Sequence, residues 1–270
     1  MLRRNWLLAL VASVALLVGC ASPITAPAPT PNPGVRSTLA PSGKLRVGVY
    51  AGSPTSMVLD KNGQKVGITL ELGREMARWL NVPFEAVEYS RIAEVIEAMK
   101  RGEVDFTFTN ATDARAKDVN FTLPMVSLEL GYLVGSGSKL QTMADVDRPG
   151  VRVGVTQGSS SQTTLGQKYK HATLVPVDTL KQAAQQIKLG QLDAFATNKG
   201  ILYELADNVP GARILAGAWG MEHMAVAIPK GRESGLPYVS SFALTVRRDG
   251  TLQSVIARSG LRGTVDPSIR

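Results

Sequence analysis

The sequence predicts an α/β fold in which two similar lobes enclose a ligand cleft, and three observations support this prediction. A strand-like segment occurs twice, as LRVGVYAG at 45–52 and VRVGVTQG at 151–158, with five of eight positions identical. A helix-glycine-strand segment also occurs twice, at 99–110 and 187–198, with five of twelve positions identical. The two offsets differ, so the units carry different insertions and are not repeats of a solenoid, whose period is fixed. Clefts between such lobes are where small ligands bind.

Hydrophobic periodicity predicts the elements of the first unit in order. Residues 45–49 alternate as a strand, which the polar loop 50–56 follows. Apolar residues at helical spacing then predict two helices, with the faces Leu72, Met76, Trp79, Leu80 and Ile92, Val95, Ile96, Met99. Gly102 is the expected stop of the second helix, and a strand over 104–108 comes next.

The second unit repeats this order, which predicts parallel βαβ connections. A strand over 151–155 precedes the polar loop 156–163, and a strand over 192–196 ends the unit. The helix between them has the apolar face Leu180, Ala183, Ala184, Ile187. Toward the C-terminus we expect a strand over 224–228, a helix with the face Val239, Phe242, Ala243, Val246, and a helix over 251–259. We interpret Asp105 and Asp193 as structural residues at the strand ends remote from the cleft.

The N-terminus has the pattern of a bacterial lipoprotein signal peptide. Arg3 and Arg4 precede an apolar run over 6–18 that is too short to span a bilayer. The run ends at Leu17-Val18-Gly19-Cys20, a lipobox-like sequence, so we expect residues 1–19 to be removed and Cys20 to be lipidated; a plain signal peptide is the alternative. The protein would then be exported and anchored to a bacterial membrane, facing the periplasm or the cell exterior.

The rest of the composition sets limits on structure and partners. Residues 20–42 are rich in Pro, Ala, Ser and Thr, which predicts an extended tether that buries nothing. The only cysteine cannot form an internal disulfide, so the core must hold the domain together. The net charge of +8 is scattered, without the basic stripe and interleaved aromatics of a nucleic-acid-binding surface. We therefore expect no nucleic-acid partner.

Ligands of parallel α/β sheets bind beyond the carboxyl ends of the strands, and this rule selects the candidate site. Asn110 and Asn198 end equivalent strands of the two units, and Tyr50 and Ser53 follow the first strand. After the equivalent strand of the second unit, Ser159, Ser160 and Ser161 begin a helix whose free N–H groups attract an anion. An ordinary serine N-cap is the alternative reading of these serines.

Arg115 is the candidate that most clearly points to an anionic ligand. It lies in Thr112-Asp113-Ala114-Arg115, just after the strand that ends at Asn110. A guanidinium group binds a carboxylate through a planar pair of donors. A solvent-exposed loop arginine is the alternative reading.

Signals for catalysis are weak. His171 and His223 lack Cys or carboxylate partners at metal-binding spacing, and the serines lack a Gly-x-Ser-x-Gly elbow. Gly48 and Gly52 do not complete a dinucleotide-binding fingerprint. The sequence therefore predicts no enzyme activity, no catalytic residue, no metal and no cofactor.

These motifs together resemble the extracytoplasmic solute-binding proteins of ABC importers, type II periplasmic-binding fold, amino-acid-binding branch. The resemblance covers about residues 43–265 and rests on short motifs in a specific order, at 43–49, 102–105, 112–124, 153–160, 190–194 and 249–252. It implies lobe 1 at 43–128 and 225–270, lobe 2 at 129–224, and crossing hinge segments near 127–132 and 222–225.

The resemblance also implies roles for the candidate residues. Arg115 would hold the ligand carboxylate from one lobe, and Ser159 and Ser160 from the other. Asn110 and Thr112 would bind the ligand head group, and Tyr89 is the nearest candidate for the aromatic residue that stacks on the ligand side chain.

One position departs from the family pattern. Asn198 stands where amino-acid binders have the aspartate that pairs with the ligand α-ammonium. A ligand with an oxyanion but no ammonium, such as a plain carboxylate or a phosphonate-like anion, therefore becomes a contender.

The predicted function is the substrate-binding component of an ABC importer, which captures a small anionic or zwitterionic solute, an amino acid or related carboxylate, by hinge closure. Its partners would be membrane permease subunits. The alternatives are a sensing component for a membrane receptor, a binder of a phosphonate-like oxyanion, and a dehydratase-type lyase on the same fold, although Asn198 stands where that reaction needs a general acid.

Overall fold

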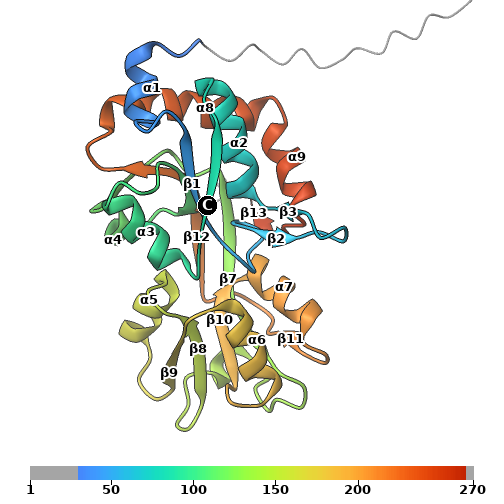
Figure 1. Ribbon diagram of the computed structural model, residues 1–270. Helices are drawn as coiled ribbons and strands as arrows, with labels where there is room; N and C mark the ends of the chain where they lie inside the picture. Colours follow the sequence, from blue (N-terminus) through green and yellow to red (C-terminus); the bar gives the residue numbers. More distant parts are fainter. Residues whose placement is uncertain (1–29, 266–270) are drawn as a thin grey trace, which may run out of the picture.

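Two α/β lobes make up the computed structural model, which describes residues 30–265 (Figure 1). The predicted signal peptide and Cys20 lie outside the described residues. Among residues 30–265, no helix is both long and apolar enough to cross a bilayer.

Lobe 1 is built around β1 (Leu45–Tyr50), which pairs in parallel with β4 (Phe84–Tyr89). A bridge from Val47 to Phe106 links β1 to the segment that leads into β5 (Thr107–Asn110). Helices cover both faces of these strands: α2 (Ile68–Leu80), α8 (Leu236–Arg248) and α9 (Thr251–Arg258) on one face, α3 (Ile92–Lys100) on the other. Shorter elements complete the lobe: β2 (Val58–Leu59), β3 (Lys65–Val66), α4 (Asp113–Ala116), β6 (Val119–Phe121), η2 (Glu233–Gly235) and β13 (Thr264–Val265).

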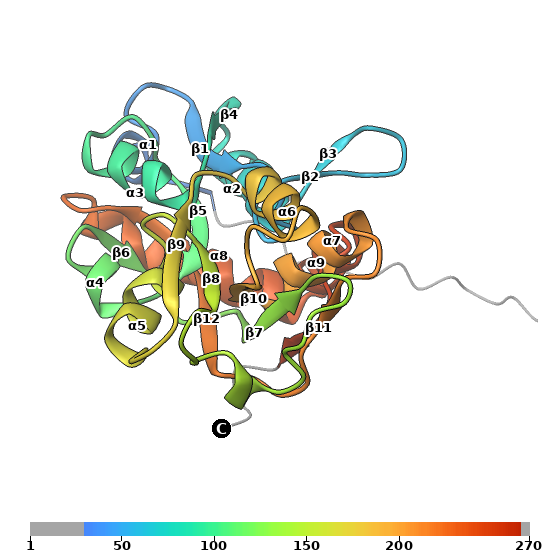
Figure 2. The same ribbon diagram turned by 90° about the horizontal axis from the view of Figure 1, so that it is seen from below.

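Lobe 2 has the same layered arrangement. Its central strand β8 (Arg152–Thr156) pairs in parallel with β9 (Thr173–Val177) and β10 (Ala194–Asn198). One face packs on α6 (Leu180–Lys188) and α7 (Lys199–Asn208), and the other on α5 (Ser160–Lys168) (Figure 2). The lobe also contains η1 (Met143–Asp145) and β11 (Arg213–Ile214).

Two long antiparallel strands, β7 (Val126–Val134) and β12 (Gly220–Pro229), carry the chain between the lobes (Figure 1). β7 pairs with β13 at Leu128 and with β10 from Leu130 onward. β12 pairs with β7 up to Met224 and with β5 from Met224 onward. Each strand therefore changes its partners from one lobe to the other within a segment in which a crossing was expected.

The predicted tether contains a helix, α1 (Pro33–Leu39). Asn32 caps it by accepting from the N–H of Val35 at 2.8 Å, and Arg36 donates to the carbonyl of Leu80 at 3.0 Å. Leu39 is 1% exposed and belongs to the lobe 1 core, packed against Gly235. The expectation that residues 20–42 bury nothing is therefore wrong for 33–40, because the core provides an apolar site for Leu39.

The two aspartates interpreted as structural make matching contacts in the two lobes. Asp105 accepts from the N–H of Arg46 at 2.9 Å and from its guanidinium at 2.9 and 2.7 Å. Asp193 makes the same three contacts with Arg152, at 2.8, 3.0 and 3.0 Å. The strands that follow these aspartates, β5 and β10, begin at 107 and 194, later than predicted. In each lobe the aspartate binds its arginine just before the strand begins.

The lobes differ in how deeply this ion pair is buried. Asp105 is 1% exposed and also accepts from Arg232 at 2.6 Å, whereas the Asp193 side chain is 35% exposed. We expect Asp105→Asn to lower the free energy of unfolding by about 3–5 kcal/mol, because two largely buried guanidinium groups, 19% and 12% exposed, lose their fully buried anion. Asp193→Asn should lower it by about 1 kcal/mol or less, because solvent screens that pair.

Urea denaturation at neutral pH measures both losses, and equal losses would contradict the ranking.

The hydrogen bond from Arg152 lowers the pKa of Asp193. The contribution of this carboxylate is therefore present above a pH of about 4, its ordinary range, and is lost as the pH falls below that.

Candidate functional site

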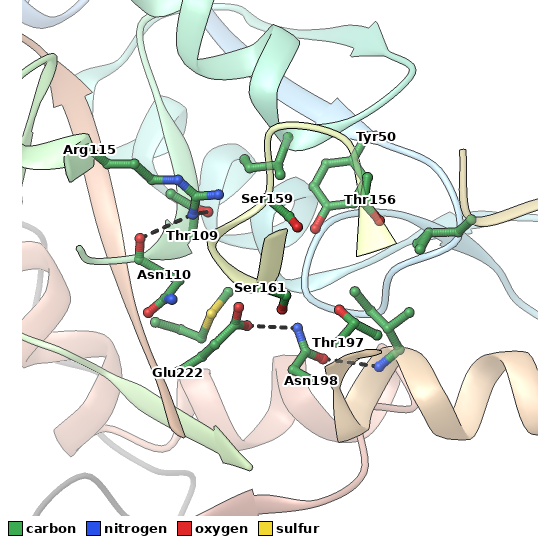
Figure 3. A pocket seen from close by; sticks show the side chains of 14 residues that line it. Tyr50, Thr109, Asn110, Arg115, Thr156, Ser159, Ser161, Thr197, Asn198 and Glu222 are labelled. Carbon is green, nitrogen blue, oxygen red and sulfur yellow. Dashed lines mark hydrogen bonds between the residues drawn. The ribbon is translucent and has the colours of Figure 1, made fainter. Parts of the chain in front are cut away.

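A pocket lies between the two lobes, where the strands of both sheets end (Figure 3). It encloses about 430 Å³ of empty space, including its open mouth. Its lining comes from lobe 1 (Tyr50, Ile92, Thr109, Asn110, Arg115), from lobe 2 (Thr156, Ser159, Ser161, Leu180, Thr197, Asn198, Ile201), and from β12 (Glu222, Met224).

Arg115 brings a positive charge into this pocket. Thr112 is the N-cap of the short helix α4, and its side chain accepts from the N–H of Arg115 at 3.2 Å. The guanidinium donates to Thr109 Oγ1 at 2.8 Å and to the Asn110 carbonyl at 3.2 Å. Within residues 30–265 it forms no ion pair. It is thus held in place by neutral oxygens and is available to an anion.

The surroundings of Arg115 favour an anionic partner. Removal from water lowers the pKa of Arg115, while the charge of Glu222 and the Tyr50 phenol oppose that shift. An arginine stays protonated even so, because its ordinary pKa lies far above neutral pH. A bound anion would therefore restore the electrostatic stabilisation that burial removes.

The first turn of α5 faces the same pocket from lobe 2. Ser159 is its N-cap and accepts from the N–H of Gln162 at 3.1 Å, so the alternative of an ordinary cap holds for this hydroxyl. The following N–H groups, of Ser160 and Ser161, begin the helix and have no acceptor inside it. Figure 3 shows Ser159 and Arg115 pointing into one space. The helix start and the guanidinium can therefore act on one anion.

Glu222 is the charged lining residue that the sequence did not single out. It is 7% exposed, on the crossing strand β12. Its Oε1 accepts from Ser160 Oγ at 3.0 Å, and its Oε2 accepts from Asn198 Nδ2 at 2.8 Å. Within the described chain it forms no ion pair. A carboxylate in an otherwise mostly apolar strand, inside a segment expected to cross between the lobes, was the available signal.

The hydrogen bonds around Glu222 continue into lobe 1. Asn110 Nδ2 donates to Ser160 Oγ at 3.3 Å, and Asn110 Oδ1 accepts from the N–H of His223 at 2.9 Å. Asn110 and Asn198, which end equivalent strands of the two units, thus belong to one network with Glu222. This network connects both lobes to β12.

The remaining wall is apolar or weakly polar. Burial raises the pKa of the Tyr50 phenol, which therefore stays protonated and can donate a hydrogen bond. The apolar lining residues are Ile92, Leu180, Ile201 and Met224. Among the described residues, no group of three or more His, Cys, Asp or Glu could hold a metal ion.

Six of the ten predicted ligand-binding residues line the pocket: Tyr50, Asn110, Arg115, Ser159, Ser161 and Asn198. The other four lie behind it. Ser53 is fully buried and hydrogen-bonded to Thr55 at 2.8 Å, Thr112 caps α4, and Ser160 is engaged by Glu222. Tyr89 ends β4 and packs against the α3 cluster, so the aromatic residue of this pocket is Tyr50.

Contacts across the cleft show that the two lobes are close together. Arg91, which precedes α3, pairs with Asp178 of lobe 2 at 3.3 Å. A Cβ on Gly158 would lie 2.6 Å from the Cβ of Ala93 in α3. The cleft is closed in this structure, and only a glycine fits at 158.

The chain is similar to known solute-binding proteins along most of its length. Residues 45–259 match the model of the bacterial extracellular solute-binding proteins, family 3. The ABC transporter glutamine-binding protein GlnH of Bacillus subtilis is 21% identical over 198 residues, 72% of each chain. The L-cystine-binding protein TcyJ of Escherichia coli is 23% identical over 225 residues, 82% of this chain and 84% of TcyJ.

A structural match agrees with this similarity. A mutant of ArgBP from T. maritima superposes with a TM-score of 0.75 at 23% identity, covering 84% of this chain and 99% of ArgBP. The predicted two-lobed α/β fold of the type II class is thereby confirmed. A membrane-bound lytic murein transglycosylase of Shewanella also matches, although the alignment covers 33% of its length.

The close approach of Gly158 to Ala93 predicts that the size of residue 158 limits how closely the two lobes can approach each other. Gly158→Ala should keep the lobes apart, because the new methyl group cannot fit at 2.6 Å from Ala93. Gly190→Ala is the matched control: its φ of 65° is close to the 72° of Gly158, but nothing lies within 4 Å of its Cβ position. Both variants share the backbone strain, and only one disturbs the cleft.

Small-angle X-ray scattering, with and without a mixture of the common L-amino acids, measures closure in solution. We expect wild type and Gly190→Ala to contract in the mixture and Gly158→Ala to stay wider. Equal contraction of the two variants would show that this contact does not limit closure.

Proposed function

The chain belongs to the bacterial extracellular solute-binding proteins, family 3, and we propose that it captures an amino acid or related carboxylate for an ABC importer. The observation that carries the proposal is Arg115, a partly buried guanidinium without an anionic partner in the described chain, in a pocket between two lobes. That GlnH and TcyJ are named as amino-acid-binding proteins supports the same class of ligand.

The arrangement of the lining residues explains how the pocket would bind such a ligand. The ligand carboxylate pairs with Arg115 and accepts from the first N–H groups of α5, so one anion joins the two lobes. Tyr50 and the apolar residues cover the rest of the ligand. Closure then excludes water, and the closed protein presents its surface to the membrane permease subunits.

The alternatives fit the pocket less well. A phosphonate-like dianion could pair with Arg115, but the carboxylate of Glu222 in the same pocket would repel it. A lyase needs a general acid, and both oxygens of the Glu222 carboxyl group already accept hydrogen bonds from Ser160 and Asn198. A protein that reports to a membrane receptor would use the same pocket, and the neighbouring genes distinguish that role from transport.

Arg115→Ala tests the proposal directly. It should weaken ligand binding by about 2–5 kcal/mol, because the buried anion loses its charged partner. Titration calorimetry of the common L-amino acids measures the loss, and a thermal melt near that of wild type shows that the fold is intact. Affinity close to that of wild type would remove Arg115 from its proposed role.

Membrane attachment is proposed from the lipobox-like sequence at Cys20, which lies outside the described residues. Cys20→Ser should abolish labelling of the protein by a metabolic fatty acid and release it from the membrane fraction. Persistent labelling would refute lipidation at this cysteine.

A further inference from the structure

We infer that Glu222 binds the positively charged group of the ligand, and that the site therefore selects zwitterions with an uncharged side chain. The inference rests on the proposed function and narrows its ligand class. The residue that binds the ligand cation would then be on the crossing strand β12, and not at position 198, where the lobe 2 strand β10 ends.

The carboxylate of Glu222 is held in place but retains binding capacity. Ser160 and Asn198 each donate one hydrogen bond to it, one to each oxygen. A carboxylate has about four acceptor positions, so two remain for donors in the pocket. A buried anion with neutral partners alone is unfavourable, and a ligand ammonium would supply the missing charge.

The two charges of the pocket match a zwitterion. Arg115 and Glu222 are the charged residues of its lining, and they form no ion pair with each other. Glu222 nevertheless acts on the pKa of Arg115 through its charge, so both lie in one electrostatic environment. An α-amino acid carries a carboxylate and an ammonium on the same carbon and can satisfy both groups. A plain carboxylate would pair with Arg115 and leave Glu222 without a cation.

The rest of the lining excludes a third charge. The other lining side chains are apolar or neutral, with Ile92, Leu180, Ile201 and Met224 beside Tyr50. A charged side chain of the ligand would lose its hydration without gaining an ion-pair partner. Selectivity against cationic and dicarboxylic amino acids follows from this.

Asn198 acquires a different role, that of a positioning residue. Its Oδ1 accepts from the N–H of Ile201 at 3.1 Å as the cap of α7, and its Nδ2 donates to Glu222. An ionised aspartate at 198 could still cap the helix, but it could not donate to Glu222. Two carboxylates at hydrogen-bond distance also resist joint ionisation. A glutamate at 222 is therefore compatible with an asparagine at 198, which can donate a hydrogen bond to it, and incompatible with an ionised aspartate there.

Matched ligand pairs test the inference by titration calorimetry. Each pair differs only in the amino group: L-alanine and propionate, L-valine and 3-methylbutanoate, L-leucine and 4-methylpentanoate. We expect wild type to prefer the tightest-binding of these amino acids over its partner at least about tenfold, and to bind L-lysine and L-glutamate more weakly. In Glu222→Gln the preference should be lost, mainly through weaker binding of the amino acid.

A charge exchange separates ligand contact from a structural role. Asn198→Asp alone should weaken amino-acid binding, because its carboxylate faces that of Glu222. The double variant Asn198→Asp with Glu222→Gln should recover part of the preference for the amino acid, because one carboxylate and one donating amide are present again. If Glu222→Gln does not fold, Asn198→Asp alone still tests the inference, because amino-acid binding that is not weakened in that variant would contradict it.

Glu129→Gln is the matched control. Glu129 lies on the other crossing strand, β7, and pairs with Lys199 outside the pocket lining, so the same loss of charge should leave the preference unchanged. Equal amino-acid affinity of wild type and Glu222→Gln would overturn the inference and leave the proposed function intact. Failure of folded wild type to bind any amino acid or carboxylate would overturn both.

Discussion

The antiparallel pairing of β7 and β12 is the constraint on which the rest of the structure depends. Five residues of each strand are in register, from Gly220 opposite Leu130 to Met224 opposite Val126. These strands join the two α/β units into one continuous sheet, because β12 pairs with β5 of lobe 1 and β7 pairs with β10 of lobe 2. Because the crossing is made of paired strands, the lobes can close on a ligand only by a change concentrated in a few residues.

The crossing strand β12 also places a carboxylate in the cleft. Glu222 lies on β12 and connects the start of α5, the end of β10 and, through Ser160, the end of β5. The Glu222 carboxylate therefore contacts lobe 2 directly and is linked to lobe 1 through the hydrogen bond between Ser160 and Asn110. A ligand that pairs with Arg115 and Glu222 would therefore stabilise the closed arrangement as it binds, which is how binding energy drives closure.

The paired arginine and aspartate of each lobe show how an internal repeat is preserved and modified. Arg46 with Asp105 and Arg152 with Asp193 make the same contacts at the ends of the sheets remote from the cleft. In lobe 1, Arg232 also pairs with Asp105, which is fully buried, whereas lobe 2 leaves Asp193 partly exposed. The repeat thus sets the geometry of the ion pair. The segments around it determine how deeply the pair is buried and how much we expect it to contribute to the free energy of unfolding.

The sequence by itself predicted the two α/β units, the approximate ends of their strands, and Arg115, Ser159 and Asn110 as candidate residues, which all line the pocket. These features depend on periodicity and on the rule that ligands meet the carboxyl ends of strands, and both are local in the chain. Only the tertiary structure decided that Leu39 reaches the core, that Tyr50 and not Tyr89 lines the pocket, and that Glu222 lines the same pocket and accepts a hydrogen bond from Asn198. Each of these results depends on packing between segments distant in sequence, which periodicity along one segment does not contain.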